Sequence, residues 1–459
     1  MTLDLDATAT TIQFFFDKKA VEAIARGTKF VRRYSPLSGQ AFLQASVFGF
    51  IENPETNLDN LAKTCGDLGI TITPQGFDQR ITFQAVNFLK QMLCKAMENF
   101  RNKIPLPLPL LQQFSAIHLT DSTILSLPDN MVEEYPGCGG DGSQASLKIQ
   151  LSFEFLYGNL EQIVLQPGRE PDQNHQTYLE RVAPGSLTIN DLGYFVLENL
   201  KTIAQEKQAY YLSRLLPKTG LLTPDSEAIN LSQWLMHQPH QAFERSVLLG
   251  KSNKHQLPCR LICMPLPQEM ADRRRQKAKE RARRQRKTLS QEYLALLDWL
   301  IFVTNVPPSM LSMAQVALLY RVRWQIELVF KLWKSYCGLK RIAGLRRERV
   351  LFELYAKMIG ITLTHFLLAP LRMPQGNQTN REISPVKVRD TFRRFARDLN
   401  RNLANLPDFV AVLAEMLAQI KRFGFKQKRQ KNPNLCHALA LAACALQVDD
   451  DQELQLPPL

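Results

Sequence analysis

The amino-acid sequence predicts an α/β protein in which a mixed β-sheet is interrupted by a β-rich insertion and flanked by helical regions at both ends. Apolar residues recur every three or four positions near the start of the chain and again from residue 346 onward, which is the helical period. Between these regions apolar and polar residues alternate in short segments, which is the period of β-strands. A chain of 459 residues that is 45% hydrophobic and 22% charged has the composition of a globular protein with more than one core.

Residues 1–105 are predicted to form helices, because strand-like alternation is absent from them. One helical pattern ends in a break from Gly66 to Gly69, and a second starts where Thr73 can cap and Pro74 can take the first helical position. This is the outline of a helix-turn-helix and suggests a DNA-binding region. Two ordinary packed helices explain the pattern equally well, because the stretch is not strongly basic.

The helical pattern ends in the proline-rich segment KIPLPLPLL, and β-structure is predicted to follow it. Strands are expected in SAIHLTDSTILSLP, LKIQLSFEF and LEQIVLQPG, with the polar residues of the second strand on the face opposite its apolar ones. A helix is expected in DQNHQTYLERV, and a fourth strand in SLTINDLGYF leads into another helix. The order strand, strand, strand, helix, strand, helix is typical of ribonuclease H-like domains, although order alone speaks only for the fold.

A second β-rich region is predicted between residues 210 and 270, where strand-like pieces alternate with polar turns. The basic run that follows, residues 273–287, holds ten basic residues and one acidic one, and so carries +9 of the net charge of +14. Such a run is commonly a solvated helix face, and in isolation it also fits a nuclear-localisation signal. Because the whole chain is basic, we expect the run to bind the phosphate backbone of a nucleic acid.

The sequence disfavours a membrane protein and a zinc protein. The most apolar candidate, MIGITLTHFLLAPL, is interrupted by Thr362, His365 and Pro370 and falls short of the roughly 18 apolar residues that a membrane span needs. The N-terminus lacks the basic and apolar parts of a signal peptide, so a cytoplasmic protein is expected. The eight cysteines lack zinc-ligand spacing and are expected to be reduced thiols in the core.

Two aspartates fall in phase with the apolar face of their predicted strands. Asp121 lies two residues after Leu119, and Asp191 two residues after Ile189. A carboxylate on a buried face is costly unless it meets a cation, a hydrogen-bond network or a cleft, so a pair on adjacent strands would suit a divalent metal. Plainer explanations also exist: Asp121 could start an Asx turn, and Asp191 could cap the next helix.

A long helix is expected to begin at a capping box formed by Ser312 and Gln315. Its polar residues share one face, within an arc of roughly 60° on a regular helix. They are Tyr320, Arg323, Glu327 and Lys334, with Lys331 beside them. An apolar stripe on another face is expected to pack on the sheet; it consists of Leu319, Val322, Ile326, Phe330 and Trp333. Spacing alone does not establish a catalytic role, because Glu327 and Lys331 also make an ordinary i,i+4 ion pair.

The segment YRVRWQIELVFKLWKS resembles the Tyr-x2-Arg-x3-Glu-x6-Lys signature of the insertion-sequence-four family of DDE transposases. HLTDSTIL is similar to the segment of the family's first aspartate, INDLGYF to that of the second, and FVTNV to the strand before the glutamate helix. The order Asp121, Asp191, Glu327 also matches, and the gap of 136 residues before the glutamate accommodates the family's β-rich insertion. The resemblance covers roughly residues 110–345.

The resemblance implies that Asp121, Asp191 and Glu327 form a catalytic triad that holds two Mg²⁺ ions, with Mn²⁺ as a substitute. In related enzymes the excised end passes through a hairpin in which a tryptophan stacks on a flipped base; Trp234 is a candidate, and Trp299 a weaker one. The implied contacts to DNA phosphates are Tyr320, Arg323 and Lys334, with Lys331 added from the helix face alone.

The expected function is that of a transposase that binds terminal inverted repeats, cleaves the ends of an insertion sequence and joins them to target DNA. Its partners would be double-stranded DNA and a second copy of the chain in a homodimer, with no membrane and no small-molecule substrate, in the cytoplasm at the nucleoid. The alternatives are a catalytically silent DNA-binding relative, which would have lost a carboxylate, and a ribonuclease H-like nuclease without strand transfer.

The expected domains follow the chain in five segments. They are a helical DNA-binding region at 1–105, the first part of a ribonuclease H-like catalytic domain at 106–222, the β-rich insertion with the basic run at 223–295, the second catalytic part with the glutamate helix at 296–345, and a helical basic region at 346–459.

Overall fold

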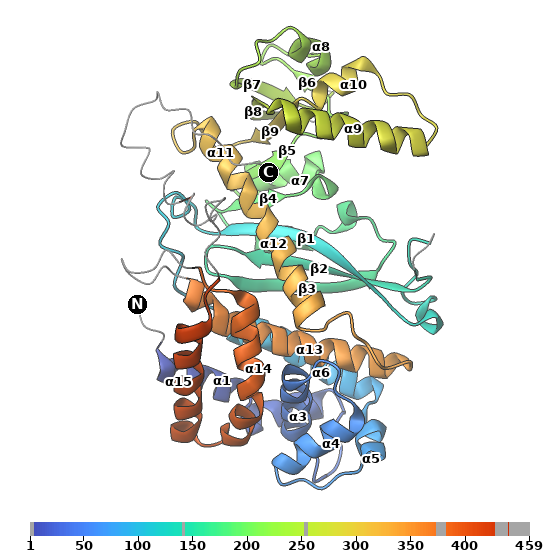
Figure 1. Cartoon of the computed structure of the whole chain (residues 1–459), viewed down its shortest axis with the longest axis vertical. Coiled ribbons are helices and arrows are strands. Elements are labelled where there is room, and N and C mark those ends of the chain that lie inside the picture. The colour runs from blue at the N-terminus through green and yellow to red at the C-terminus, as the bar shows by residue number, and fades with distance from the viewer. Residues whose placement is uncertain (1–3, 140–142, 252–255, 373–381, 427–438, 440–459) are drawn as a thin grey trace. The chain divides into compact units, whose positions relative to one another are not determined.

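The computed structural model describes residues 4–139, 143–251, 256–372, 382–426 and 439. Contacts divide these residues into two compact units, each assembled from separate stretches of the chain (Figure 1). The first, here called the helical unit, draws on the stretches 1–107, 122–170 and 327–430, and the second, here called the sheet unit, on 108–121 and 171–326. The domain boundaries given above remain a prediction, because the units follow contacts and not chain order.

The helical unit contains the helices of both terminal regions, as predicted. They are α1 (Leu5–Phe15), α2 (Lys18–Gly27), α3 (Gly39–Glu52), α4 (Leu58–Asp67), α5 (Pro74–Arg80), α6 (Phe83–Asn99), α13 (Arg347–Leu368), α14 (Pro385–Asn402) and α15 (Leu406–Phe423). Thr73 Oγ1 accepts a hydrogen bond from Gly76 N, and Pro74 starts α5. The break between α4 and α5 is confirmed, with Gly69 in the left-handed region at φ 75°.

The longest helix, α13, forms the core of the helical unit. It packs against α3 and α6, and the ring of Phe352 contacts Phe42, Phe50 and Phe77 at centroid distances of 5.5, 5.9 and 6.1 Å. By length and composition this helix could cross a membrane, but 94% of its apolar window is buried inside the protein. A helix that is apolar on all sides and covered on all sides is the core helix of a folded unit.

The helical unit also holds an antiparallel hairpin of β2 (Ser146–Glu154) and β3 (Asn159–Pro167), two strands that the sequence predicts. The alternation along β2 does not separate a buried face from a solvent face, because every residue of the strand is buried. Two of its charged side chains, those of Lys148 and Glu154, find partners inside the protein. Lys148 Nζ donates to the carbonyl of Glu170, and Glu154 accepts from the N–H groups of Leu156 and Tyr157 at 2.8 and 2.6 Å.

The sheet unit is built on a mixed sheet, so the predicted α/β class is confirmed. In spatial order the strands are β1 (Ile117–Ser126, of which the part up to 121 belongs to this unit), β4 (Leu187–Asn190), β5 (Tyr210–Arg214), β9 (Trp299–Thr304), β8 (Leu257–Pro265), β7 (Phe243–Leu249) and β6 (Leu221–Leu222). β1, β4 and β5 run parallel, and the remaining neighbours pair antiparallel. The helices of this unit include α7 (Leu197–Lys201), α8 (Leu231–Met236), α9 (Gln268–Arg284) and α10 (Gln291–Leu296).

Two predicted helices are less regular than expected. DQNHQTYLERV forms only the 3₁₀ turns Asp172–Asn174 and Thr177–Arg181. The long helix consists of α11 (Met313–Tyr320), a 3₁₀ turn (Arg321–Arg323), α12 (Trp324–Lys331) and a π-turn (Leu332–Tyr336). The capping box at its start is confirmed, and its apolar stripe is buried. Because 3₁₀ and π turns change the rotation per residue, the polar residues do not share the arc of one regular helix.

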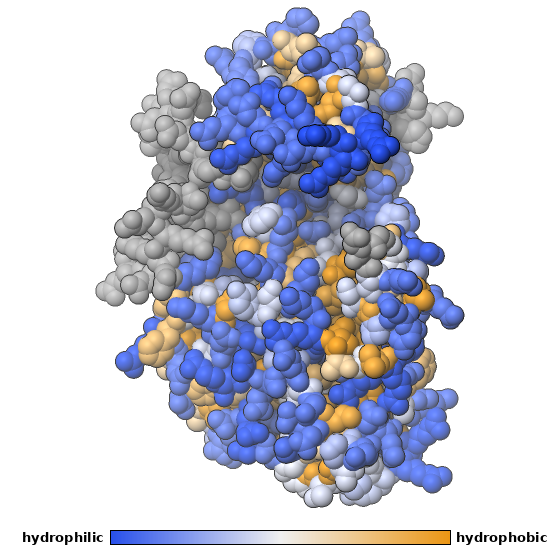
Figure 2. All heavy atoms as spheres, turned by 45° about the vertical axis from the view of Figure 1, so that its right-hand side comes forward, coloured by the Kyte–Doolittle hydropathy of each residue, from blue (hydrophilic) through white to orange (hydrophobic). Residues whose placement is uncertain are grey.

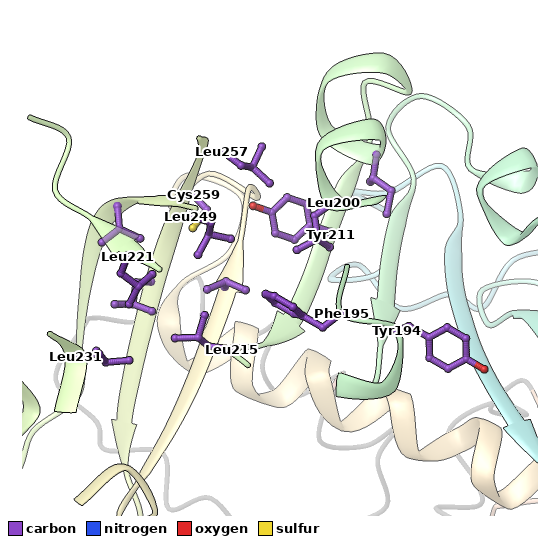
Figure 3. Close-up of a cluster of buried hydrophobic side chains, with 14 of the residues drawn as sticks. Tyr194, Phe195, Leu200, Tyr211, Leu215, Leu221, Leu231, Leu249, Leu257 and Cys259 are labelled. Carbon is purple, nitrogen blue, oxygen red and sulfur yellow. The ribbon is translucent and has the colours of Figure 1, made fainter. Parts of the chain in front are cut away.

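The core of the sheet unit is a cluster of side chains from the sheet and the segments around it. Figure 3 shows Tyr211, Leu249, Leu257 and Cys259 close together on β5, β7 and β8. Burial raises the pKa of the Cys259 thiol to about 12, so it stays protonated. Buried reduced thiols were expected, and those described are Cys65, Cys259 and Cys263. Cys94 and Cys138 are exposed, Cys337 is half-buried, and Cys436 and Cys444 lie outside the described residues.

Candidate active site

Asp121 and Asp191 lie at neighbouring positions, where β4 ends beside β1. β1 and β4 pair in register as far as Thr120 opposite Asn190, and the residue after each of these two is an aspartate. Adjacent strands lie about 4.8 Å apart. The structure therefore brings these two predicted residues together.

Local turn structure does not account for the two aspartates. β1 continues past Asp121 to Ser126, so no Asx turn begins there. Asp191 takes the N-cap position of the 3₁₀ turn Leu192–Tyr194, but its side chain makes no capping hydrogen bond and its backbone stays extended at φ −77° and ψ 166°. Both aspartates are half-buried. Capping or starting a turn therefore does not explain why these two carboxylates are partly desolvated.

Tyr320 and Arg323 lie beside the aspartate pair. Arg323 Nη1 is 3.9 Å from Asp121 Oδ2, and these side chains are 16% and 20% exposed. The ring of Tyr320 packs on Phe302 of β9 at a centroid distance of 5.1 Å. Burial raises the pKa of Tyr320 to about 12, with Asp191 acting in the same direction and Arg323 against it. The phenol therefore keeps its proton at neutral pH and can donate it to an acceptor.

Glu327 lies one helical turn after Arg323, on α12, and belongs to the helical unit. The helix is anchored just beyond it, because Phe330 and Trp333 are buried and Trp333 Nε1 donates to His365 Nε2 on α13 at 2.9 Å. Among the described residues, no three His, Cys, Asp or Glu side chains gather closely enough to hold a metal ion. The structure thus brings together two of the predicted carboxylates, Asp121 and Asp191, and the assignment of Glu327 to the same site stays a prediction.

The two predicted lysines occupy different environments. Lys331 is exposed at the last position of α12, whereas Lys334 is half-buried inside the π-turn. Their assignment to DNA contact stays a prediction.

A polar network behind the aspartate pair has no evident signal in the sequence. Thr120 N donates to Asn190 Oδ1 at 3.2 Å, which ties β1 to β4 one residue before the aspartates. The buried Tyr178 hydroxyl accepts from Asn199 Nδ2 at 3.4 Å and also hydrogen-bonds Asn190. Buried networks of this kind restrain the groups that they join, so we assign Asn190 to positioning the two strands.

Asn305 restrains the strand that leads into α11. Its Oδ1 accepts from Tyr211 N at 2.8 Å, and its Nδ2 donates to the carbonyl of Ala209 at 2.9 Å. Thr304 Oγ1 donates to the carbonyl of Tyr211 at 2.6 Å. The side chains of the FVTN segment therefore fix the end of β9 on β5.

The two tryptophans considered as candidates for stacking on a flipped base do not present an exposed ring. Trp299 is 5% exposed in the core, and Trp234 is half-buried, with its ring 5.1 Å from that of Phe243. Trp324, which the sequence analysis does not single out, is 54% exposed between Arg323 and Glu327. The sequence feature that could have pointed to Trp324 is a large aromatic residue outside the apolar stripe of the helix.

The chemistry of the aspartate pair fits a hard divalent cation. Carboxylate oxygens are the ligands that Mg²⁺ and Mn²⁺ prefer, and two carboxylates this close repel each other unless a positive charge lies between or beside them. Arg323 offsets the charge of Asp121. The two aspartates could therefore share a Mg²⁺ ion, with Arg323 as the neighbouring cation.

Known proteins resemble this chain along most of its length. The model of the family described as "Transposase DDE domain" matches residues 113–363. The transposase for insertion sequence element IS231F of Bacillus thuringiensis subsp. israelensis is 28% identical over 442 residues, which cover 91% of either chain. The transposase for IS1151 of Clostridium perfringens is 26% identical over 460 residues, which cover 96% of this chain and 97% of the relative.

Proposed function

The chain belongs to the transposase DDE domain family, with the ribonuclease H-like fold class expected from its sequence, and from that premise we propose that it is the transposase of an insertion sequence. It binds the terminal inverted repeats of the element, cleaves the DNA ends by metal-dependent phosphoryl transfer and joins them to target DNA in cut-and-paste transposition. The observation that carries the proposal is the register that sets Asp121 beside Asp191, with Arg323 3.9 Å from Asp121.

Asp121, Asp191 and Glu327 would hold two Mg²⁺ ions, for which Mn²⁺ can substitute. When bound, such ions supply activation of a water or 3′-hydroxyl and stabilisation of the leaving oxygen. Asn190 would keep the two aspartates in register through Thr120 N. The chain's own task is to hold Asp121 and Asp191 side by side.

Tyr320, Arg323 and Lys334 would grip phosphates near the cleaved end. Arg323 offers a bidentate fork and Lys334 a point charge, while Tyr320, whose pKa is raised to about 12 mainly by burial, donates a hydrogen bond. In the DNA-free protein Arg323 lies next to Asp121. Entry of a phosphate would draw Arg323 away from Asp121 and leave the carboxylate to a metal ion.

Double-stranded DNA is the proposed partner of the basic surface as well. α9 carries most of the basic run, and its Arg273, Lys277, Lys279, Arg281, Arg283 and Arg284 are exposed. Strongly hydrophilic side chains gather over this helix in Figure 2. A homodimer would hold the two DNA ends of the element together. On α12, the exposed Trp324 is available to stack on a base, and Lys331 would add a DNA contact.

The test is cleavage of a duplex that contains the element's terminal repeat, read from the DNA flanking the gene. Wild type in Mg²⁺ is compared on a denaturing gel with Asp121→Asn, Asp191→Asn and Glu327→Gln, with the exposed Asp225→Asn as the matched control. We expect the three site variants to lose cleavage and keep end binding, and the control to behave as wild type.

Other outcomes would contradict parts of the proposal. A site variant that cleaves like wild type removes that residue from the triad. If wild type and all variants bind the end duplex and none of them cleaves it, the protein is a catalytically silent DNA-binding relative. Cleavage whose 3′-ends are never joined to a second duplex indicates a nuclease without strand transfer.

A further inference from the structure

Tyr178 contacts the chain on both sides of Asp191. Its hydroxyl accepts a hydrogen bond from Asn199 Nδ2 at 3.4 Å and also bonds Asn190, the residue before Asp191. Its ring packs edge-to-face on that of Tyr194, at a centroid distance of 6.3 Å and an interplanar angle of 89°. Tyr194 N in turn donates to the carbonyl of Asp191 at 3.0 Å. A single side chain therefore contacts both the end of β4 and the turn that follows Asp191.

The hydroxyl of Tyr178 acts on the sheet from the face opposite to that of Asp191. Successive residues of an extended segment point to opposite faces, and the backbone of Asp191 is still extended. Asn190 Oδ1 accepts from Thr120 N on β1 at 3.2 Å, so the side chain of Asn190 joins Tyr178 to β1. The path from Tyr178 to the aspartate pair thus runs behind the sheet and uses no group on the face of the aspartates.

The segment that carries Tyr178 buries two polar rings and little else. Residues 171–181 form only short 3₁₀ turns, and the buried residues among them are His175 and Tyr178. These two rings pack on each other at a centroid distance of 6.1 Å, and that of His175 also contacts Tyr194 at 6.5 Å. Two apolar side chains would fill the same place at less cost. The buried hydroxyl of Tyr178 therefore points to a task other than packing.

We propose that Tyr178 is a positioning residue of the aspartate pair. Through Asn190 and Tyr194 it fixes the backbone on both sides of Asp191, so that this carboxylate meets a metal ion together with that of Asp121. The inference rests on the proposed function and adds a residue outside the Tyr-Arg-Glu-Lys signature and outside the two aspartate segments. Tyr178 itself contacts neither the metal ion nor the DNA.

The protonation state of Tyr178 suits this task. Burial raises its pKa to about 12, and the hydrogen bonds to Asn199 and Asn190 act against burial. The phenol therefore stays neutral at the pH of a cleavage assay, and both hydrogen bonds persist there. Residues that restrain a metal ligand from behind typically change metal affinity or activity by roughly 10- to 100-fold when they are replaced.

The test uses Tyr178→Phe, which removes the hydroxyl and keeps the ring. Single-turnover cleavage of the end duplex is measured over a series of Mg²⁺ concentrations, and hydrogen–deuterium exchange of the metal-free protein is followed by mass spectrometry. We expect the Mg²⁺ concentration for half-maximal cleavage to rise roughly tenfold, with little change in the rate at saturating Mg²⁺ or in end binding without metal. The amides of residues 191–195 should exchange faster, because the restraint on this segment is lost.

The matched control is Tyr211→Phe, which removes another buried tyrosine hydroxyl from the sheet unit. Tyr211 is 1% exposed on β5, and Figure 3 shows its ring apart from that of Tyr194. Its loss should leave unchanged both the Mg²⁺ requirement and the exchange of residues 191–195, while thermal unfolding reports the effect of each substitution on stability. A purely structural role of Tyr178 would make the two variants behave alike and would contradict the proposal.

A double-mutant cycle tests the path through Asn190. Tyr178→Phe and Asn190→Ala should each raise the Mg²⁺ requirement, and the double variant should raise it no further than Asn190→Ala alone, because both substitutions remove the same connection. Additive effects would contradict action through Asn190. If Tyr178→Phe does not fold, Asn199→Leu decides, since it removes the other hydrogen bond of the Tyr178 hydroxyl and should shift the Mg²⁺ requirement in the same direction.

The proposal is overturned if wild type cleaves the end and Tyr178→Phe matches it in either the Mg²⁺ requirement or the exchange of residues 191–195. That result leaves the transposase proposal intact. Wild type that does not cleave the end overturns both proposals, because the reaction that Tyr178 would serve is then missing.

Discussion

Lowering the pH should destabilise the helical unit through His365. Its imidazole is buried, and Trp333 Nε1 donates to its Nε2, so that nitrogen must stay unprotonated. If Nε2 were protonated, its N–H would face the N–H of Trp333, and both donors would be buried without an acceptor. Burial, followed by the charge of Arg372, lowers the pKa of His365 from 6.5 to about 3.

The sign and size of the effect follow from linkage. Between pH 6.5 and 3 the unfolded chain binds a proton that the folded protein does not, so the free energy of unfolding falls as the pH falls through this window. Between pH 7.5 and pH 5 the loss from His365 amounts to about 2 kcal/mol. Urea unfolding followed by far-UV circular dichroism at these pH values measures it.

The contribution of His365 is isolated by substitution. His365→Phe lowers the free energy of unfolding at pH 7.5, because the indole N–H of Trp333 loses its acceptor. It should also remove about 1 kcal/mol of the pH dependence between pH 7.5 and 5.5. The exposed His237→Gln serves as the control and should keep that pH dependence. If His365→Phe and wild type lose stability equally between these pH values, the buried neutral imidazole is not its source.

Three further predictions concern capping, thiols and salt. Ser312→Ala removes the capping box of α11 and should lower the free energy of unfolding by about 1 kcal/mol, whereas Ser312→Thr keeps the hydroxyl; equal stability of all three proteins would contradict this. A thiol reagent should label the exposed Cys94 and Cys138 in the native protein and reach the buried Cys65 only after unfolding, as peptide mass spectrometry can show; early labelling of Cys65 would mean an open helical unit. Replacing three exposed arginines of the basic run by glutamine, Arg281, Arg283 and Arg284, should lower the slope of log K against log salt for DNA binding by up to about 2.7. An unchanged slope would mean that the run points away from DNA.

Features that depend on neighbours in the chain could be predicted from the sequence. The cap at Thr73, the capping box at Ser312 and the strand that carries Asp121 each depend on residues within a few positions of one another. Asp121 and Asp191 stood out because a carboxylate in phase with apolar residues is unexpected on energetic grounds.

Features that depend on pairing between distant segments could not be predicted. Nothing local marks Tyr178, because its contacts to Asn190 and Tyr194 arise from the packing of separate segments. The polar residues of β2 gave a two-faced pattern, and only the packing shows that both faces are buried. The 3₁₀ turn before Trp324 was not predicted either, since the apolar stripe around it predicts a continuous helix.

The way the helical unit is assembled has a consequence for its synthesis. Its core helix, α13, covers α3 and α6, yet it begins at Arg347, whereas α6 ends at Asn99. At a ribosomal rate of 5–20 residues per second, the apolar faces of α3 and α6 wait roughly 10 to 50 s for their partner. Long-range pairing of this kind folds slowly. The nascent chain therefore presents a chaperone with uncovered apolar helices throughout the time in which the sheet unit is being made.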